Sequence, residues 1–271
     1  MTGLGGAGDG ESVVDRAIGV AAEAFGPRLS AAYALGSIAH GGFAPLVSDV
    51  DVMLVLDGVD PATSARMADV RERVRRDVPG ELADRLSIFW SDPPGVRRGA
   101  GEHSRLPEVD RLDLLDSGRL LLGDDCRAGA TRPTTDALVL RAAEFALTTF
   151  DDAYRARLRD PDDLVAGGAR PVTKAVLFPV RFLYTLATGR LGHNTDAAAW
   201  YSGHHEHADL AAAAATWRTT GLTDPEAARR LLSTGLRPIY ATFTAEYVLA
   251  LRELGQDSTA DRLAAWGELI R

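Results

Sequence analysis

Two aspartates at the start of an apolar run are the residues in this chain best suited to chemistry. Asp49 and Asp51 open the run D-V-D-V-M-L-V-L, which ends at Leu56. Residues two apart in a strand point to the same face, so the two carboxylates would lie side by side. Adjacent carboxylates repel each other unless a cation neutralises them, and Mg²⁺ carrying a nucleoside triphosphate would do so. The pair therefore predicts a metal-bound nucleotide.

A small-residue turn precedes the aspartates. Gly36-Ser37 follows a short apolar run, and eleven residues separate Ser37 from Asp49. Glycine allows the backbone to approach a phosphate closely, and a serine hydroxyl together with backbone N–H groups can hold a triphosphate. The alternative is an ordinary turn followed by a strand that begins with two solvated aspartates. The turn, the spacing and the apolar run together favour the nucleotide site.

The elements that would position these residues alternate between helices and strands. Hydrophobic periodicity and the positions of Gly and Pro predict the boundaries. Helices are expected at 11–25 and 61–78, strands at 30–35, 49–56 and 86–90, a loop at 93–107, and a short helix with a strand over 112–122.

The second half of the chain is predicted to be helical throughout. The expected helices are 136–159, 172–188, 196–217, 224–233, 238–254 and 259–270. Gly, Asp, Thr and Pro cluster near 123–135, which predicts a domain boundary there. We therefore expect a flexible leader at 1–10, a first domain at 11–125 and a second domain at 135–271.

Composition narrows the function classes. The 271 residues carry a formal net charge of −8, which disfavours nucleic-acid binding and suits a cationic small substrate. A single cysteine, Cys126, excludes an intramolecular disulfide and a multi-cysteine metal site. No apolar run is long enough for a membrane span, and the Gly-rich start has no signal-peptide pattern. These features predict a cytoplasmic protein without a membrane partner. They do not indicate an oligomeric state.

The Gly-Ser turn, the spacer and the Asp-x-Asp strand together resemble the signature of the DNA polymerase beta-like nucleotidyltransferase superfamily. The resemblance implies that Gly36 and Ser37 hold the triphosphate and that Asp49 and Asp51 bind Mg²⁺ and serve in catalysis. It also implies an α/β nucleotidyltransferase domain, with a small mixed sheet and flanking helices, followed by an all-α helical bundle.

The second half resembles a subgroup of that superfamily, the aminoglycoside adenylyltransferases acting on streptomycin and spectinomycin. The segment K-A-V-L-F-P-V-R-F-L-Y-T-L-A-T-G is similar to a helix of those proteins, and the A-x-x-W that follows also matches. The matching residues are Arg181, Tyr184, Leu186, Gly189, Ala197 and Trp200.

This resemblance implies that ATP and Mg²⁺ are used to transfer AMP to a hydroxyl of a small acceptor. Lys174 and Arg181 lie seven residues apart and share a helix face, where they would meet the triphosphate. A solvated or salt-bridged face is the alternative interpretation of this pair.

One departure from the family concerns a third carboxylate. Family enzymes carry it on the next core strand, where Ser87 stands in this chain. Serine does not act as a base at neutral pH without help. Asp84 and Asp92 flank the strand, but each is an odd number of residues from Ser87, so neither shares its face. Glu102 and His103 lie in the following loop. Which residue replaces the third carboxylate stays open.

Other departures affect the acceptor and the reaction. His193-Asn194 replaces a Ser-Lys pair of the relatives, and Leu183 stands where the streptomycin-acting ones tend to carry Trp. Two further hypotheses therefore stand beside the small-molecule enzyme. One is a nucleotidyltransferase of the toxin–antitoxin type that modifies a protein or tRNA. The other is a nucleotide-binding homologue with weakened or lost catalysis.

Overall fold

The computed structural model describes residues 7–99 and 101–270. The chain folds into two compact units, one ending at Pro133 and the other beginning at Thr134. The first unit is an α/β domain and the second is helical. Within the described residues, no helix is both long and apolar enough to cross a membrane.

A mixed four-stranded sheet forms the centre of the first unit. Its strand order is β3-β2-β1-β4, and β2 pairs parallel to β3 while β1 pairs antiparallel to both β2 and β4. The strands are β1 (Leu29–Leu35), β2 (Val50–Leu56), β3 (Leu86–Ser91) and β4 (Arg119–Gly123). The three predicted core strands thus form adjacent members of one sheet.

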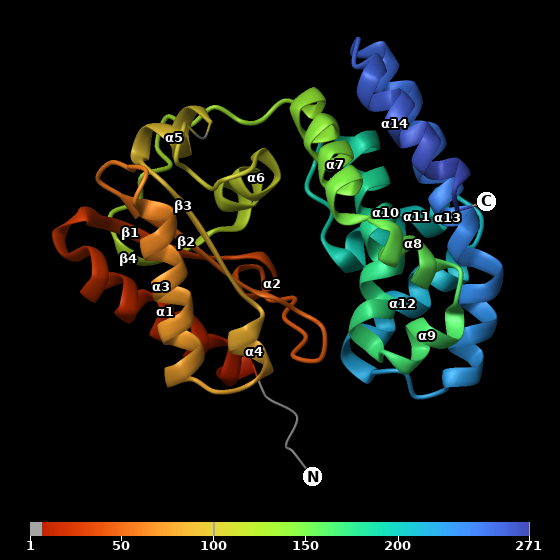
Figure 1. Ribbon diagram of the computed structural model, residues 1–271, viewed down its shortest axis with the longest axis horizontal. Coiled ribbons are helices and arrows are strands. Elements are labelled where there is room, and N and C mark those ends of the chain that lie inside the picture. Colours follow the sequence, from red (N-terminus) through yellow and green to blue (C-terminus); the bar gives the residue numbers. More distant parts are fainter. Residues whose placement is uncertain (1–6, 100, 271) are drawn as a thin grey trace. The chain divides into compact units, whose positions relative to one another are not determined.

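Helices cover both faces of this sheet (Figure 1). The helices α1 (Ala7–Phe25) and α3 (Thr63–Asp77) pack on one face, where Val70 and Val74 are buried as predicted. The helices α5 (Pro93–Arg98) and α6 (Glu108–Ser117) supply Val96 and Leu114 to the core of the other face. Two short helices, α2 (Gly36–Ala39) and α4 (Glu81–Asp84), and the 3₁₀ turn η1 (Gly26–Arg28) complete the unit.

Two local predictions in this unit need correction. The first helix begins at Ala7 and so extends into the predicted leader, of which residues 1–6 lie outside the described residues. Gly10 is buried because the ring of Phe43 packs where a side chain would be, 2.8 Å from an ideal Cβ. The predicted loop at 93–107 contains α5, whose N-cap is Asp92, which accepts a hydrogen bond of 2.8 Å from the Gly95 N–H.

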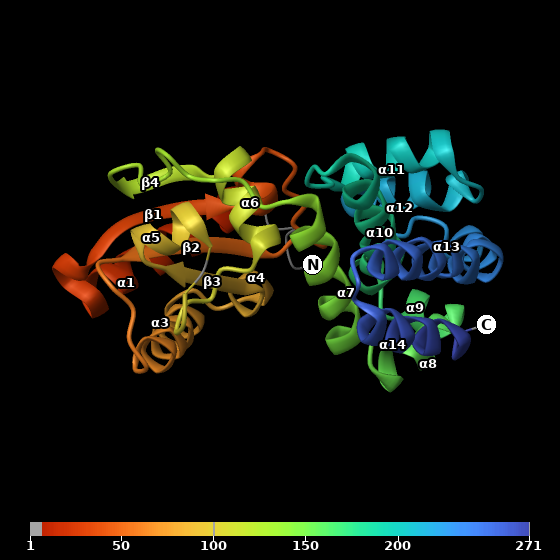
Figure 2. The same cartoon turned by 90° about the horizontal axis from the view of Figure 1, so that it is seen from above.

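The second unit is a bundle of helices around one core, and residues 134–270 contain no strand. Its helices are α7 (Thr135–Thr149), α8 (Asp152–Leu158), α9 (Pro161–Ala166), α10 (Ala169–Thr188), α11 (Asn194–His204), α12 (Ala208–Thr220), α13 (Pro225–Glu253) and α14 (Asp257–Glu268). Figure 2 shows α11 beside α12 and α13 beside α14, and the helices of each pair pack against each other.

Three helix boundaries differ from the predictions because local and tertiary contacts override periodicity. The predicted helix 136–159 ends at Thr149, and Asp151 caps α8 by accepting from the Tyr154 N–H at 2.8 Å. The predicted helix 196–217 breaks before His207, which adopts a left-handed φ of 60°. The predicted stop before Pro238 is absent, since α13 runs through it with Ile239 and Tyr240 fully buried.

Candidate functional site

The Gly36-Ser37 turn joins the end of β1 to the first turn of α2. Gly36 has a φ of 59°, in the left-handed region that favours glycine. In the sheet, Leu35 pairs with Asp51, so the Asp51 side chain lies next to the turn. Asp51 Oδ2 is 2.7 Å from the position an added Cβ of Gly36 would take. Two motif residues that are far apart along the chain are therefore in direct contact.

A buried carboxylate that the sequence interpretation missed approaches the same glycine. The Gly36 N–H donates to Asp113 Oδ2 at 2.6 Å, and Asp113, on α6, is only 6% exposed. Ser117 donates to the other carboxylate oxygen of Asp113. The sequence carries no clear signal for this burial, because Asp113 lies in the segment D-R-L-D-L-L-D, where charged residues and leucines are mixed. The Gly36 N–H is thus bonded within the protein.

Asp49 and Asp51 stand at the entrance of β2. Asp51 is the second residue of the strand, whereas Asp49 comes just before its first residue, Val50. Both side chains are partly exposed, as is Ser37 in the second position of α2. Within the described residues, no group of three or more His, Cys, Asp or Glu side chains is arranged to hold a metal ion. Asp49 and Asp51, the residues predicted to bind a cation, therefore lie two positions apart at the start of β2.

Ser87, which stands where the family enzymes carry a third carboxylate, lies directly beside Asp51. In the parallel pairing of β2 with β3, Asp51 is opposite Ser87, and both residues are partly exposed. The nearby acidic residues have other partners. Asp84 accepts from Arg75 at 2.7 Å, and Asp92 caps α5. Neither of them fills the space beside Ser87.

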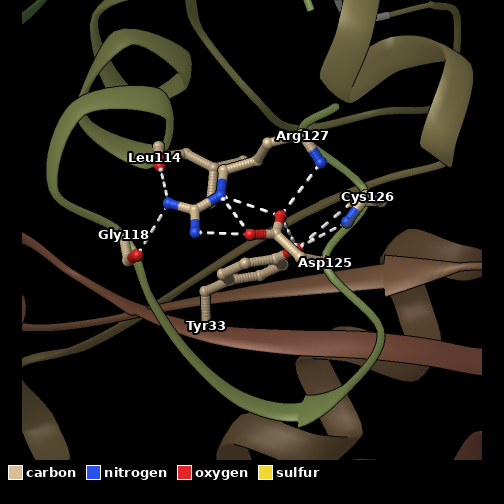
Figure 3. A network of polar contacts seen from close by, with 6 residues as sticks. All are labelled: Tyr33, Leu114, Gly118, Asp125, Cys126 and Arg127. Carbon is tan, nitrogen blue, oxygen red and sulfur yellow. Dashed lines mark hydrogen bonds and ion pairs between the residues drawn. The ribbon is translucent and has the colours of Figure 1, made fainter. Parts of the chain in front are cut away.

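A polar network fixes the helix that carries Asp113 (Figure 3). Arg127 donates to the carbonyl oxygens of Leu114 at 3.1 Å and Gly118 at 2.8 Å, at the end of α6. The same guanidinium binds Asp125 and lies 5.2 Å from the ring centroid of Tyr33, on β1. The network therefore ties α6 to the strand that leads into Gly36.

The contacts within this network shift the pKa values of Asp125 and Tyr33. The hydrogen bond from Arg127 holds the pKa of the Asp125 carboxyl well below its usual range. Burial raises the pKa of the Tyr33 phenol, whose oxygen accepts from the Cys126 N–H at 2.9 Å and donates to Asp125 at 3.1 Å. Cys126 is thus a buried member of the structural network.

The two cations predicted to meet the triphosphate lie on α10, in the second unit. Lys174 Nζ is 5.9 Å from the ring centroid of Phe178, and Arg181 Nε donates to the Gly192 carbonyl at 2.7 Å. Arg218, on α12, is 7% exposed, and burial followed by the charge of Arg181 lowers its pKa. Arg181 and Arg218 therefore influence each other electrostatically between α10 and α12.

Other residues of the second unit have packing roles. Tyr184 and Trp200, both in the segment that carries the family resemblance, meet edge to face at 5.9 Å between ring centroids. His204 stacks on Trp200, and His205 stacks on Tyr201. Among the described residues, neither histidine belongs to a group of three or more His, Cys, Asp or Glu side chains that could hold a metal ion. His204 is the last residue of α11, and His205 follows it.

Comparison with known proteins identifies a shared fold. No protein-family model and no curated protein matches the chain. A solved structure of the spectinomycin adenyltransferase AAD(9) from Enterococcus faecialis, with ATP and spectinomycin, matches with a TM-score of 0.54. The match covers 83% of this chain and 99% of that one at 11% sequence identity. At this identity the likeness shows the fold, an α/β domain followed by a helical region.

Proposed function

We propose that this protein transfers AMP from ATP to a hydroxyl group of a small, polar, cationic acceptor. The observation that carries the proposal is the contact between Asp51 and Gly36, which places a partly exposed carboxylate against the Gly36-Ser37 turn. The fold shared with a structure that contains ATP and spectinomycin supports the same class of reaction.

The aspartate pair suits Mg²⁺. Mg²⁺ prefers oxygen ligands and is commonly held by one or two carboxylates, with water and substrate phosphates completing the shell. Asp49 and Asp51 offer such a donor set, and no third His, Cys, Asp or Glu of the described residues joins them. When bound, the ion would neutralise charge on the triphosphate as pyrophosphate leaves. The two aspartates would hold it, and Ser37 would orient the phosphates from the start of α2.

The second unit would supply cations and the acceptor site. Lys174 and Arg181 are proposed to contact the triphosphate, since both are partly exposed on one helix. The net charge of −8 would attract a cationic acceptor over longer distances. An aminoglycoside is the acceptor class that satisfies these conditions and carries many hydroxyl groups.

Ser87 favours a second candidate function, which is nucleotide binding with little or no transfer. The residue beside Asp51 cannot accept a proton from the acceptor hydroxyl at neutral pH without help. Loss of a general base typically lowers a rate by about 10² to 10⁴. The aspartate pair is compatible both with slow transfer of AMP and with binding of the nucleotide without transfer.

Mass spectrometry after incubation with ATP, Mg²⁺ and a panel of aminoglycosides tests the proposal. We expect an acceptor to gain the mass of one AMP with the wild-type protein and Asp51→Asn to lower the rate by at least about 10². Asp57→Asn is a matched control, because Asp57 follows the other end of β2 and is exposed. It should leave the rate unchanged.

The same samples separate the two candidate functions. ATP affinity that depends on Mg²⁺ and on Asp51, without any modified acceptor, would support nucleotide binding alone. No product on any acceptor, together with an ATP affinity that Asp51→Asn does not change, would refute both.

A further inference from the structure

A cavity lies on the face of the sheet opposite Ser87. It has a volume of about 310 Å³ and lies between α3 and the edge strand β3. Ile88 and Trp90 line it, and both alternate with Ser87 along β3, so they point to the other face. Its volume falls at the lower end of the range for small-molecule sites. The cavity is therefore separate from the Asp51 site.

The floor of this cavity is apolar and rigid. Met67, Ile88 and Trp90 line it and are 2%, 2% and 7% exposed, respectively. The Trp90 indole N–H donates to the His103 carbonyl oxygen at 2.8 Å, which fixes the ring. An apolar group of a ligand could contact the part of this floor that Trp90 leaves exposed.

Arginines surround the floor. Arg71, Arg75 and Arg105 all line the cavity, and Glu72 is the one acidic residue among its lining side chains. Arg71 donates to the Asp84 carbonyl oxygen at 3.2 Å, and Arg105 donates to the Ile88 carbonyl oxygen at 2.8 Å. The Arg105 guanidinium also lies 5.2 Å from the ring centroid of Phe89 and 5.8 Å from that of Trp90.

The charges of these arginines are compensated unequally. Arg75 binds the carboxylates of both Asp84 and Glu72. Across residues 7–99 and 101–270, Arg71 and Arg105 form no ion pair with a carboxylate, and the hydrogen bonds of their guanidinium groups go to backbone carbonyls. A guanidinium has five N–H donors, so each of the two retains donors for a ligand. Arg71 and Arg105 therefore give this cavity positive charge that no carboxylate pairs with, although the chain as a whole has a net charge of −8.

We propose that this cavity binds a small molecule that carries a phosphate group on a planar apolar ring. The ring would lie on Trp90 and Ile88, next to the Arg105 guanidinium. The phosphate would accept hydrogen bonds from Arg71 and Arg105, whose planar forks suit phosphate oxygens. Neither contact uses a residue of the proposed transferase site.

Isothermal titration calorimetry with 1-naphthyl phosphate tests this site on the full chain. We expect saturable binding by the wild type, and binding at least about tenfold weaker for 1-naphthol and for inorganic phosphate, since each lacks one of the two contacts. Arg71→Gln and Arg105→Gln should each weaken binding by about tenfold, because each removes a charge-assisted hydrogen bond.

Three variants are controls. Arg76→Gln removes an exposed arginine of the same helix that does not line the cavity, and binding should stay within about twofold. Arg75→Gln should have a small effect of similar size, because that charge is already shared with two carboxylates. Asp51→Asn should leave binding unchanged, which separates this cavity from the transferase site.

Ala68→Trp is a variant of a different kind. Ala68 is exposed on α3 and lines the cavity, so a large side chain there should block it without disturbing the core. The proposal is wrong if the wild type does not bind the probe. It is also wrong if Arg71→Gln, Arg105→Gln and Ala68→Trp all bind like the wild type, or if Asp51→Asn abolishes binding.

Discussion

Gly36 is held by three constraints that act on a single residue. Its φ of 59° excludes most side chains, Asp51 occupies the space of a Cβ, and Asp113 accepts its N–H. The sequence motif predicts a glycine that allows a phosphate to approach the backbone. The structure adds that this glycine is required for the carboxylate beside it, so the turn and the proposed metal ligand depend on each other.

Gly36→Ala should destabilise the protein more than a glycine substitution that is strained only in its backbone. Gly41→Ala is the matched control, because Gly41 has a φ of 81° but no atom within 4 Å of an added Cβ. Left-handed backbone costs a non-glycine residue about 1–2 kcal/mol, and displacement of Asp51 should add about 1–3 kcal/mol at Gly36. Urea unfolding midpoints measure both. Equal losses would mean that the contact with Asp51 is unimportant.

At the scale of elements, the position of α6 decides where Asp113 lies. Arg127 joins the end of that helix to Asp125 and Tyr33, so the loop after β4 contributes to the candidate site from a distance. Periodicity predicts a short helix here but not its partners, because ion pairs and cation–π contacts between separate segments leave no local pattern. The same holds for α10 and α12, whose arginines influence each other only in the folded unit.

Stability should depend on Asp125 in a defined pH range. Its folded pKa is depressed, so its contribution is fully present above the unfolded pKa of about 4 and is lost as the pH falls through the folded value. Because the side chain is 45% exposed, solvent screening limits the effect of Asp125→Asn at pH 7 to about 1 kcal/mol. Urea titrations from pH 7 to pH 2 should show this difference shrinking below about pH 4. A constant difference would contradict the assignment.

Two glycines in helices of the second unit should respond in opposite directions. An added Cβ at Gly235, on α13, would lie 2.9 Å from Leu210 Cδ2 on α12, whereas Gly203 on α11 has nothing within 4 Å. Gly235→Ala should cost about 1–2 kcal/mol by overpacking, despite the better helix propensity of alanine. Gly203→Ala should stabilise by about 0.5 kcal/mol. Thermal melting measures both, and stabilisation by Gly235→Ala would refute close packing of α12 and α13.

At the scale of the whole molecule, each unit has its own hydrophobic core. The first unit packs both faces of its sheet, and the second packs its helices around fully buried residues such as Leu183, Tyr240 and Phe243. The sequence predicts an α/β domain followed by a helical domain, and the two units are of these two kinds. The boundary falls at Pro133, at the end of the predicted linker.

Residues 134–271 should therefore fold when produced alone. Their core is contained within the unit, so burial of apolar surface should suffice for a cooperative transition. Circular dichroism should show a helical spectrum with one sharp thermal transition. A helical spectrum that decays gradually on heating would indicate that the unit needs the rest of the chain.

The sequence by itself determined the order of elements and the chemistry offered by individual residues. Apolar runs and breaks predicted the three core strands, the helical second half and the turn before Asp49 and Asp51, because these signals are local along the chain. The single helix predicted over 196–217 was wrong, because the chain breaks before His207, and the break predicted between 233 and 238 was wrong, because α13 runs through Pro238.

Only the tertiary structure decided which residues meet. It placed Asp51 against Gly36, brought the unsuspected Asp113 to the same glycine, set Ser87 beside Asp51 and gathered arginines around Trp90. Strand register, helix packing and side-chain burial determine these contacts, and each depends on segments far apart in the sequence. The Gly-Ser turn and the aspartate pair could therefore be predicted as a candidate site, whereas the contact of Asp113 with Gly36 and the cavity beside α3 could not be predicted.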